Sequence, residues 1–300
     1  MIQPINVPRE QFPKSDVKSE GMITLNVSCD NRDVKCFTDI EYINREGISL
    51  SIQLILPSDR NENTPLVIYV PGSAFRWQNV KGVIPSACLL ANRGFAVAMV
   101  QYRGSEVASF PAQMLDVKAA VRFMKLNAYK YRLNSDHVYL MGDSSGGHSV
   151  LMAGLTAGLE QFEEEIYNEV SSEVKGIIDL YAPTDITKMN DELSSMDHIA
   201  PDSPEGCLIG RLNVLEHPEL TEPTIVMNYI DSAREIPPVL IFHGTNDELV
   251  PFGQSCMLYD KLVQCKKKAT FYAIENAHHG GREFWSNQVL DIIEEFIKRV

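Results

Sequence analysis

Short apolar runs recur along this chain, and stretches with helical periodicity separate them. The runs cover residues 66–70, 95–100, 138–141, 177–182 and 239–242, and a last strand is expected near 270–275. Strands that are apolar on both faces are covered on both sides, and strands that alternate with helices form parallel sheets. The spacing predicts helices over 114–128, where Met114, Val117 and Val121 share one face, and over 285–300. The pattern therefore predicts an α/β fold with a mostly parallel, doubly wound sheet.

The N-terminal third departs from this alternation. Residues 1–21 are rich in proline and charge, which is typical of a loose arm. Three β-rich runs then follow at 22–29, 35–44 and 48–56, with a turn expected at Asp30-Asn31-Arg32-Asp33, and they predict an antiparallel start to the sheet. A proline-punctuated stretch over 184–236 is too long for a bare connection and predicts a small cap-like insertion with short helices of its own. We therefore expect an arm at 1–21 and one domain at 22–300.

Composition narrows the classes of partner. The 300 residues carry a formal net charge of −13, which opposes phosphate backbones and anionic lipid surfaces, so neither a nucleic acid nor a membrane is expected as a partner. No stretch approaches about 18 uninterrupted apolar residues, and residues 1–21 lack the apolar core of a signal peptide, so a cytoplasmic location is expected. A homodimer is a base-rate expectation. Six scattered cysteines are interpreted as free thiols, and nothing supports a Cys29–Cys36 link.

The strongest chemical signal is the segment Gly142-Asp143-Ser144-Ser145-Gly146-Gly147-His148, which follows an expected strand and opens an expected helix. A serine in G-x-S-x-G stands on a sharp turn, where its hydroxyl is exposed and flanking glycines let the strand and helix approach. Ser144 is therefore the candidate nucleophile. The Ser145 amide lies at the start of the helix and is a candidate oxyanion donor.

A nucleophilic serine requires a base and a carboxylate that orients it. Asp247 follows the strand at 239–242 on a loop at the carboxyl end of the sheet, where open α/β sheets place their sites. Glu248 is its nearest rival. Thirty-two positions after Asp247, the adjacent residues His278 and His279 compete for the base position, and the glycine after His279 favours His279. The order Ser, Asp, His is that of an α/β-hydrolase triad.

The loop that follows residues 66–70 is expected to complete the oxyanion hole. Its sequence is Pro71-Gly72-Ser73-Ala74-Phe75-Arg76-Trp77, and small residues there let backbone amides turn inward. The Ser73 and Ala74 amides are the candidate donors, with Phe75 and Trp77 as walls of the substrate pocket. A plain glycine turn is the alternative interpretation.

Together these motifs resemble the α/β-hydrolase superfamily, within it the esterase/lipase group related to hormone-sensitive lipase and to bacterial acetylxylan and feruloyl carbohydrate esterases. The marks are PGSAF, VQYRG, GDSSGGH, YAPTDI, APDSPEGCLIG, HGTNDELVPFGQS and ENAHHGG, spread from about residue 36 to the C-terminus. The resemblance implies Ser144 as nucleophile, Asp247 as acid and His279 as base. Relatives often have His-Gly-Gly-Gly at the oxyanion loop and alanine where this chain has Ser145, so the oxyanion geometry is less defined than the triad.

The expected activity is hydrolysis of short-acyl esters, including acetyl or feruloyl esters of carbohydrates, through an acyl-enzyme on Ser144. This chemistry needs no cofactor and no metal, and its partner is a small-molecule ester. A peptidase or amidase of the same superfamily is an alternative, as is an inactive binding protein on this fold. Narrow walls at Phe75 and Trp77, and the lack of a long apolar lid, favour short acyl groups.

Overall fold

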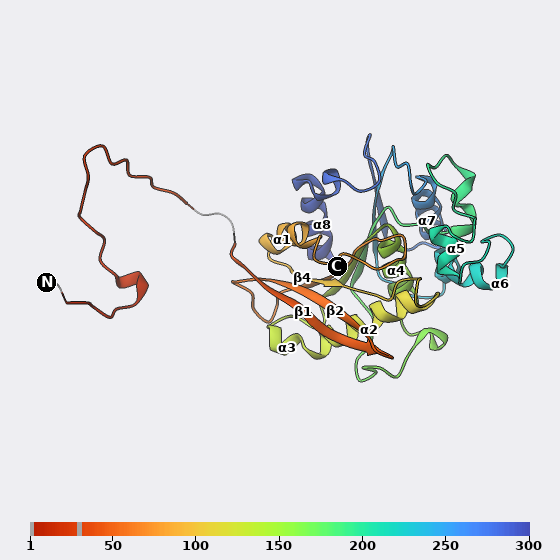
Figure 1. Cartoon of the computed structure of the whole chain (residues 1–300), viewed down its shortest axis with the longest axis horizontal. Coiled ribbons are helices and arrows are strands. Elements are labelled where there is room, and N and C mark those ends of the chain that lie inside the picture. The colour runs from red at the N-terminus through yellow and green to blue at the C-terminus, as the bar shows by residue number, and fades with distance from the viewer. Residues whose placement is uncertain (1–2, 29–31) are drawn as a thin grey trace. The chain divides into compact units, whose positions relative to one another are not determined.

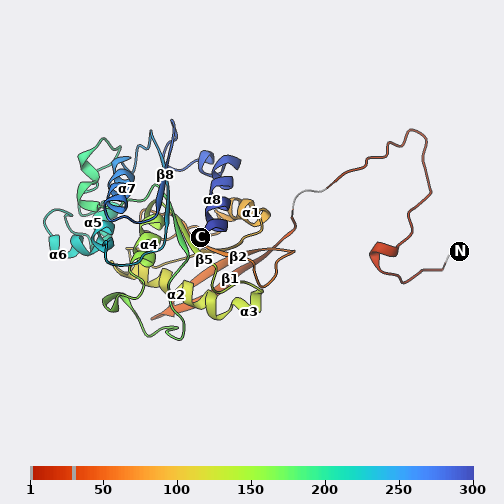
Figure 2. The same cartoon turned by 180° about the vertical axis from the view of Figure 1, so that it is seen from behind.

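The computed structural model describes residues 3–28 and 32–300, and the chain divides after residue 31 into two units (Figures 1 and 2). Residues 3–28 are exposed throughout and contain one short 3-10 helix, η1 (Arg9–Gln11). The strand expected at 22–29 is not formed over residues 22–28, so that prediction is wrong. Its β-branched residues have no partner strand, and β-propensity alone does not build a strand without pairing. Cys29 and most of the turn expected at 30–33 lie outside the described residues.

Residues 32–300 contain an eight-stranded sheet in the order β1-β2-β4-β3-β5-β6-β7-β8. The strands are β1 (Val34–Arg45), β2 (Ile48–Pro57), β3 (Leu66–Val70), β4 (Ala96–Val100), β5 (Val138–Asp143), β6 (Gly176–Leu180), β7 (Val239–Gly244) and β8 (Ala269–Ile274). β2 runs antiparallel to β1 and β4, and all remaining pairs are parallel. The predicted mostly parallel sheet with an antiparallel start is confirmed.

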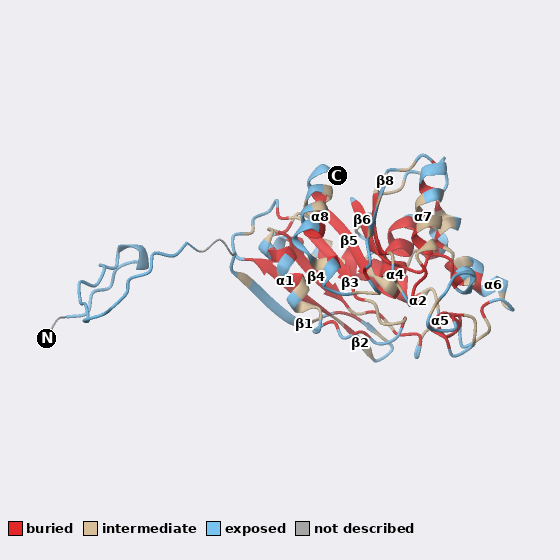
Figure 3. Cartoon of the chain, turned by 90° about the horizontal axis from the view of Figure 1, so that it is seen from above, coloured by how far each residue is buried: buried red, intermediate tan, exposed pale blue. Residues whose placement is uncertain are grey.

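Helices cover both faces of this sheet, as Figure 3 shows by the buried strands between them. Residues of α1 (Ile84–Asn92) and α8 (Asn287–Arg299) pack on one face, against side chains such as Val67 and Tyr69. Residues of α2 (Ala112–Leu126), α4 (Ser144–Leu155) and α7 (Gly253–Gln264) pack on the other, against Leu66 and Ile68. Successive side chains of a strand point to opposite faces, so a short run such as β3 must be apolar at every position.

The stretch at 184–236 folds into short helices beside α7 (Figure 1). These are η3 (Ile186–Asp191), α5 (Pro204–Leu208), α6 (Pro218–Thr221), η4 (Glu222–Thr224) and η5 (Val226–Tyr229). Ser203 caps α5, because its hydroxyl accepts a hydrogen bond of 2.9 Å from the Gly206 amide. Ile186, Ile209 and Val214 form a small core within the stretch. The remaining short elements are α3 (Ala128–Tyr131), η2 (Glu160–Phe162) and η6 (Arg282–Trp285).

The parallel strands end together at one edge of the sheet. In their pairing, Val70 of β3 lies opposite Gly142 of β5, and Gly244 of β7 lies opposite Ile274 of β8. The loops after these strands therefore meet, and they are the loops that carry the candidate catalytic residues. Over residues 3–28 and 32–300, the structure contains no helix of the length and apolar character needed to span a bilayer.

Candidate active site

Ser144 stands on a turn that only a glycine-flanked sequence can make. β5 ends at Asp143 and α4 begins at Ser144. The φ of Ser144, 51°, lies in the left-handed region that residues other than glycine rarely adopt. A Cβ on Gly142 would lie 2.5 Å from the Gly146 carbonyl oxygen, and a Cβ on Gly146 would lie 2.1 Å from that of Val70. The two glycines therefore permit the tight turn, and β3 and α4 hold the strained serine in place.

The hydroxyl of Ser144 is the first member of a hydrogen-bonded relay. Its Oγ lies 3.0 Å from His279 Nε2. The other ring nitrogen of His279, Nδ1, lies 2.8 Å from Asp247 Oδ2 and 3.0 Å from Oδ1. The structure thus brings together the three residues that the sequence singled out, from the loops after β5, β7 and β8. These are hydrogen-bond distances suited to proton transfer between hydroxyl and imidazole.

Asp247 is buried, and its carboxylate is saturated by donors. Its Oδ1 accepts hydrogen bonds from the Leu249 amide (2.9 Å) and the Val250 amide (2.8 Å). Burial alone would raise the pKa of Asp247, but hydrogen bonds from His243 and His279 lower that pKa well below its usual range. The carboxylate therefore stays ionised at any pH at which the protein functions.

His243 is a second imidazole on this carboxylate, and the sequence did not reveal its role. Its Nδ1 lies 2.7 Å from the Ser255 hydroxyl, while its Nε2 lies 3.0 Å from the Val250 carbonyl and 3.2 Å from Asp247 Oδ2. A carbonyl only accepts, so Nε2 carries the proton and also faces the carboxylate. His243 is fully buried at the end of β7, and its Nε2 shares Asp247 Oδ2 with His279 Nδ1.

The base itself is held by an aromatic ring. Tyr181 follows β6, and its ring packs edge-on against the His279 imidazole at a centroid distance of 4.9 Å. Its φ of 45° turns the chain so that the side chain faces the site. The Phe284 ring packs against the Tyr181 ring in turn, at a centroid distance of 4.4 Å. Aromatic packing of this kind limits rotation of the imidazole.

His278 lies outside the relay. Its side chain is 69% exposed, and its Nδ1 lies 3.1 Å from Glu248 Oε2. Of the two adjacent histidines, only His279 faces Ser144. Glu248, the rival of Asp247, forms a surface pair with His278, and its carboxylate also accepts a hydrogen bond of 3.3 Å from the His279 amide. The His279 ring is hydrogen-bonded to Asp247 instead.

The oxyanion loop differs from the expectation at Ser73. The Ser73 amide donates a 2.9 Å hydrogen bond to Ser145 Oγ, so it is not directed at the space beside Ser144. The Ala74 amide has no hydrogen-bond acceptor among residues 3–28 and 32–300. Ser145 is the second residue of α4, where backbone amides lack a partner within the helix. The candidate donors that remain are the Ala74 and Ser145 amides.

Ser145 also ties the loop to the sheet through its hydroxyl. Ser145 Oγ lies 3.2 Å from the Tyr102 hydroxyl, which lies 3.0 Å from Ser73 Oγ. Ser73 in turn donates its hydroxyl hydrogen to the Arg76 carbonyl at 2.5 Å. The serine that replaces the common alanine therefore anchors an oxyanion loop that lacks the common glycines. Burial raises the pKa of Tyr102 to about 12, so this hydroxyl stays neutral.

A pocket of about 310 Å³ opens beside Ser144. Phe75 lines this pocket as expected, and the rest of the Phe75 side chain is buried. Trp77 does not line it and is 41% exposed, so the prediction of Trp77 as a wall is corrected. The physical reason is the left-handed backbone at Ala74 and Phe75, with φ of 55° and 59°, which reverses the chain before Trp77. The opposite wall comes from the 184–236 stretch, through His198 and Glu205 among others.

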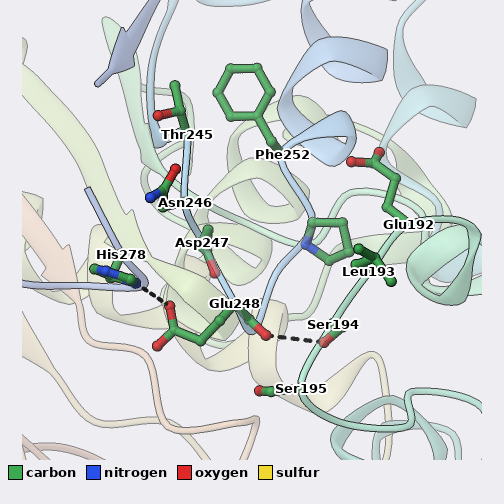
Figure 4. Close-up of a pocket in the computed structure, with 11 residues that line it drawn as sticks. Glu192, Leu193, Ser194, Ser195, Thr245, Asn246, Asp247, Glu248, Phe252 and His278 are labelled. Carbon is green, nitrogen blue, oxygen red and sulfur yellow. Dashed lines mark hydrogen bonds and ion pairs between the residues drawn. The ribbon is translucent and has the colours of Figure 1, made fainter. Parts of the chain in front are cut away.

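A second, more open groove of about 590 Å³ is lined by residues 245–248 of the 245–250 loop (Figure 4). Phe252 and Thr245 line one side of it, and Glu192 and Leu193 of the 184–236 stretch face them. Asp247 also lines this groove. The 245–250 loop, which we call the acid loop because it carries Asp247, therefore lies between the groove and the catalytic pocket. Over the described ranges 3–28 and 32–300, no group of three or more His, Cys, Asp or Glu residues has the geometry to hold a metal ion.

Comparison with known proteins places this site in a family. The model of the BD-FAE family matches residues 52–262, which span β2 to α7 and contain Ser144 and Asp247. The chain belongs to the BD-FAE family. Its fold is the α/β-hydrolase fold, and the resemblance to the esterase/lipase group is confirmed.

Curated relatives and solved structures are similar to this BD-FAE chain over most of its length. The probable carboxylic ester hydrolase LipM of Mycobacterium tuberculosis is 27% identical over 224 residues, which are 72% of this chain and 48% of LipM. A truncated carbohydrate esterase from gut microbiota superposes with a TM-score of 0.81 at 27% identity, covering 91% of this chain and 98% of that one. A bifunctional GH43-CE protein of Bacteroides eggerthii superposes with a TM-score of 0.78 at 28% identity, covering 88% of this chain and 38% of that one. The chain spans about half the length of the mycobacterial relatives.

Proposed function

We propose that this chain is a serine carboxylic ester hydrolase with Ser144 as nucleophile, His279 as general base and Asp247 as the orienting acid. The observation that carries the proposal is the continuous relay from Ser144 Oγ to His279 Nε2 (3.0 Å) and from His279 Nδ1 to Asp247 Oδ2 (2.8 Å). A serine hydroxyl is a weak nucleophile until an adjacent base takes its proton. The names of the relatives, which include carboxylic ester hydrolases and a carbohydrate esterase, support the same reaction.

In the first half of the reaction, Ser144 Oγ attacks the ester carbonyl carbon while its proton passes to His279 Nε2. The carbonyl oxygen becomes an oxyanion, which the Ala74 and Ser145 amides stabilise. The ester C–O bond then breaks, the alcohol leaves with the proton from His279, and the acyl group remains on Ser144. In the second half, His279 removes a proton from water, whose oxygen attacks the acyl carbon. The bond between the acyl carbon and Ser144 Oγ then breaks, His279 returns the proton to Ser144 Oγ, and the acid is released.

The electrostatics of the site favour these steps. Asp247 remains a carboxylate and stabilises the imidazolium that forms on His279. The positive end of the α4 dipole lies at Ser144, where the negative oxyanion develops. Removal of one oxyanion donor costs about 100- to 1000-fold in rate in serine hydrolases, so the Ala74 and Ser145 amides contribute nearly as much as the base.

We further propose that the preferred substrates are short-acyl esters, with acetyl or feruloyl esters of carbohydrates as the favoured class. The pocket of about 310 Å³ lies at the lower end of the range for small-molecule sites, which supports a small acyl group. The carbohydrate esterase from gut microbiota and the bifunctional GH43-CE protein support the sugar component.

The test compares wild type with Ser144→Ala on p-nitrophenyl acetate, butyrate and octanoate. Wild type is expected to hydrolyse acetate and butyrate faster than octanoate, and Ser144→Ala is expected to lose turnover by at least about 10⁴-fold while its unfolding transition is unchanged. Undiminished hydrolysis by Ser144→Ala would refute the assignment of the nucleophile. A preference for octanoate would refute the small acyl site.

The same substrates distinguish the alternative functions. An amidase or peptidase would cleave the matched p-nitroanilides with a kcat/KM comparable to that of the esters, whereas an esterase acts on the esters alone. A binding protein without activity would turn over neither. We expect ester turnover only, because the relatives named above include carboxylic ester hydrolases and a carbohydrate esterase.

A further inference from the structure

The wall of the catalytic pocket opposite Phe75 contains a buried ion pair that the reaction does not use. Glu205, on α5, is 3% exposed, and His198, on the loop before it, is 1% exposed. Glu205 Oε2 lies 2.9 Å from His198 Nδ1. Both residues line the pocket that contains Ser144. Burial of such a pair costs desolvation free energy, which only good geometry and further hydrogen bonds offset.

The hydrogen bonds of His198 define its protonation. Its Nε2 lies 2.9 Å from the Leu249 carbonyl, which only accepts, so Nε2 carries a proton. Its Nδ1 faces the Glu205 carboxylate, which also accepts. The Ser194 hydroxyl also lies 2.9 Å from Nε2. Acceptors thus face both ring nitrogens, which favours the imidazolium form. Burial lowers the pKa of His198, but the hydrogen bond to Glu205 outweighs burial, and the pKa is raised overall.

This arrangement positions the Glu205 carboxylate through one oxygen and leaves the other oxygen unused. Oε2 is held by His198, whereas Oε1 accepts no hydrogen bond from any residue of 3–28 or 32–300. Oε1 is not among the fully enclosed polar atoms that lack a partner, so it retains contact with solvent, and Glu205 lines the pocket beside Ser144. Its neighbours in the wall, Met196, Pro204 and Leu249, offer no side-chain donor. A strong acceptor therefore faces the substrate space.

We propose that Glu205 Oε1 accepts a hydrogen bond from a hydroxyl group of the bound ester, which makes this site selective for esters of polyhydroxylated alcohols such as sugars. The proposal rests on the esterase function proposed above and adds the residue that selects the alcohol. A hydroxylated substrate replaces the water on the carboxylate with a hydrogen bond. An alkyl ester of the same shape displaces that water but has no hydroxyl to donate, so the carboxylate oxygen is left without a hydrogen bond. Sites built for a substrate hydroxyl reject such analogues strongly.

The first arm of the test needs no variant. Wild type is given a methyl xyloside monoacetate with free hydroxyls and the matched monoacetate of tetrahydropyranol, which has the same ring without them. Acetate release gives kcat/KM for each. We expect the hydroxylated ester to be preferred by about 100-fold or more. Equal values, or turnover of p-nitrophenyl acetate with no turnover of the xyloside, would overturn the proposal.

The second arm changes the carboxylate. In Glu205→Gln a neutral amide replaces the carboxylate, and either its NH₂ group or its neutral carbonyl oxygen faces the pocket, according to whether His198 Nδ1 keeps its proton. A neutral group then replaces a charged acceptor, so the preference is expected to fall about tenfold while turnover of the tetrahydropyranyl ester changes less than about threefold. The double variant His198→Leu with Glu205→Leu removes both charges and is expected to reduce the preference to below about fivefold.

Glu192→Gln is the matched control. Glu192 is an exposed carboxylate of the same 184–236 stretch, it lines the neighbouring groove, and the preference should stay at the wild-type value. A wild-type preference in Glu205→Gln would overturn the proposal, and thermal unfolding of each variant identifies any that is not folded. If the double variant does not fold, the substrate pair on wild type and Glu205→Gln still decides. Failure of the proposed function is distinct, because wild type would then hydrolyse neither these esters nor p-nitrophenyl acetate.

Discussion

Replacement of Asp247 by Asn tests the relay where the structure defines it best. In the native protein Oδ1 accepts the Leu249 and Val250 amides, and Oδ2 accepts His279 Nδ1. The Asn carbonyl oxygen must take the position of Oδ1, because two backbone donors point there. Its NH₂ group then faces His279, which can respond only by presenting a bare Nδ1 and placing its proton on Nε2. A proton on Nε2 prevents His279 from accepting the one on Ser144.

The expected loss follows from this wrong tautomer. The same exchange in a serine protease triad lowers kcat about 10⁴-fold, which corresponds to about 5.5 kcal/mol of transition-state stabilisation. Here His243 Nε2 also faces Oδ2, at 3.2 Å, so the NH₂ group meets a second donor. We therefore expect kcat to fall by at least about 10⁴-fold and stability to fall by about 1–3 kcal/mol.

The assay is steady-state hydrolysis of p-nitrophenyl acetate at pH 7.5, with urea unfolding of each protein to show that it is folded. His278→Gln is the matched control, because His278 is adjacent to the base in sequence but lies outside the relay. Its kcat is expected to stay within about twofold of wild type. A folded Asp247→Asn variant within tenfold of wild type, or a large loss in His278→Gln, would refute this reasoning.

Three further predictions follow from the same contacts. Gly146→Ala places a Cβ 2.1 Å from a β3 carbonyl oxygen and is expected to lower the free energy of unfolding by about 3 kcal/mol or more in urea, whereas an unchanged midpoint would contradict the tight elbow. Ser145→Ala removes the acceptor of the Ser73 amide, so kcat should fall about tenfold with little change in KM; an unchanged kcat would contradict the anchoring role. Because the pKa of His198 is raised in the folded protein, its pair with Glu205 contributes its full stabilisation below about pH 6.5, and this contribution is lost as pH rises through the folded pKa. The urea midpoint of wild type should therefore decline over that pH range relative to the midpoint of His198→Asn. Parallel plots of midpoint against pH for the two proteins would contradict this prediction.

The sheet and the triad were predictable because local sequence determines them. A five-residue run such as β3 is apolar at every position only when both faces are covered, and a serine between glycines after a strand has few folds available. Asp247 and His279 follow strands whose carboxyl ends share one edge, so topology alone brings them together.

The remaining features depend on contacts that no local pattern encodes. The choice of His279 over His278 depends on a tertiary turn, in which Asn276 adopts a φ of 59° and Gly280 one of 76°. Trp77 points away because two residues before it adopt left-handed backbone, although neither is a glycine. The diversion of the Ser73 amide depends on a hydroxyl 72 positions later in the chain.

The 184–236 stretch shows the same limit most clearly. Its length predicted short helices, yet its apolar residues lack a helical period, so the sequence did not predict which side chains face the site. Glu205 and His198 enter the pocket wall because Leu249, on the acid loop, provides the acceptor that orients His198. Only the folded chain reveals that contact.

The most direct measurement for the central claim is the site of covalent trapping by a fluorophosphonate. The probe should add one equivalent, seen by intact mass, and peptide mapping should place the adduct on Ser144; the Asp247→Asn protein should react far more slowly, and Ser144→Ala not at all. An adduct on any other residue, or a folded wild-type protein that stays unmodified under conditions that label a known serine esterase, would contradict the account.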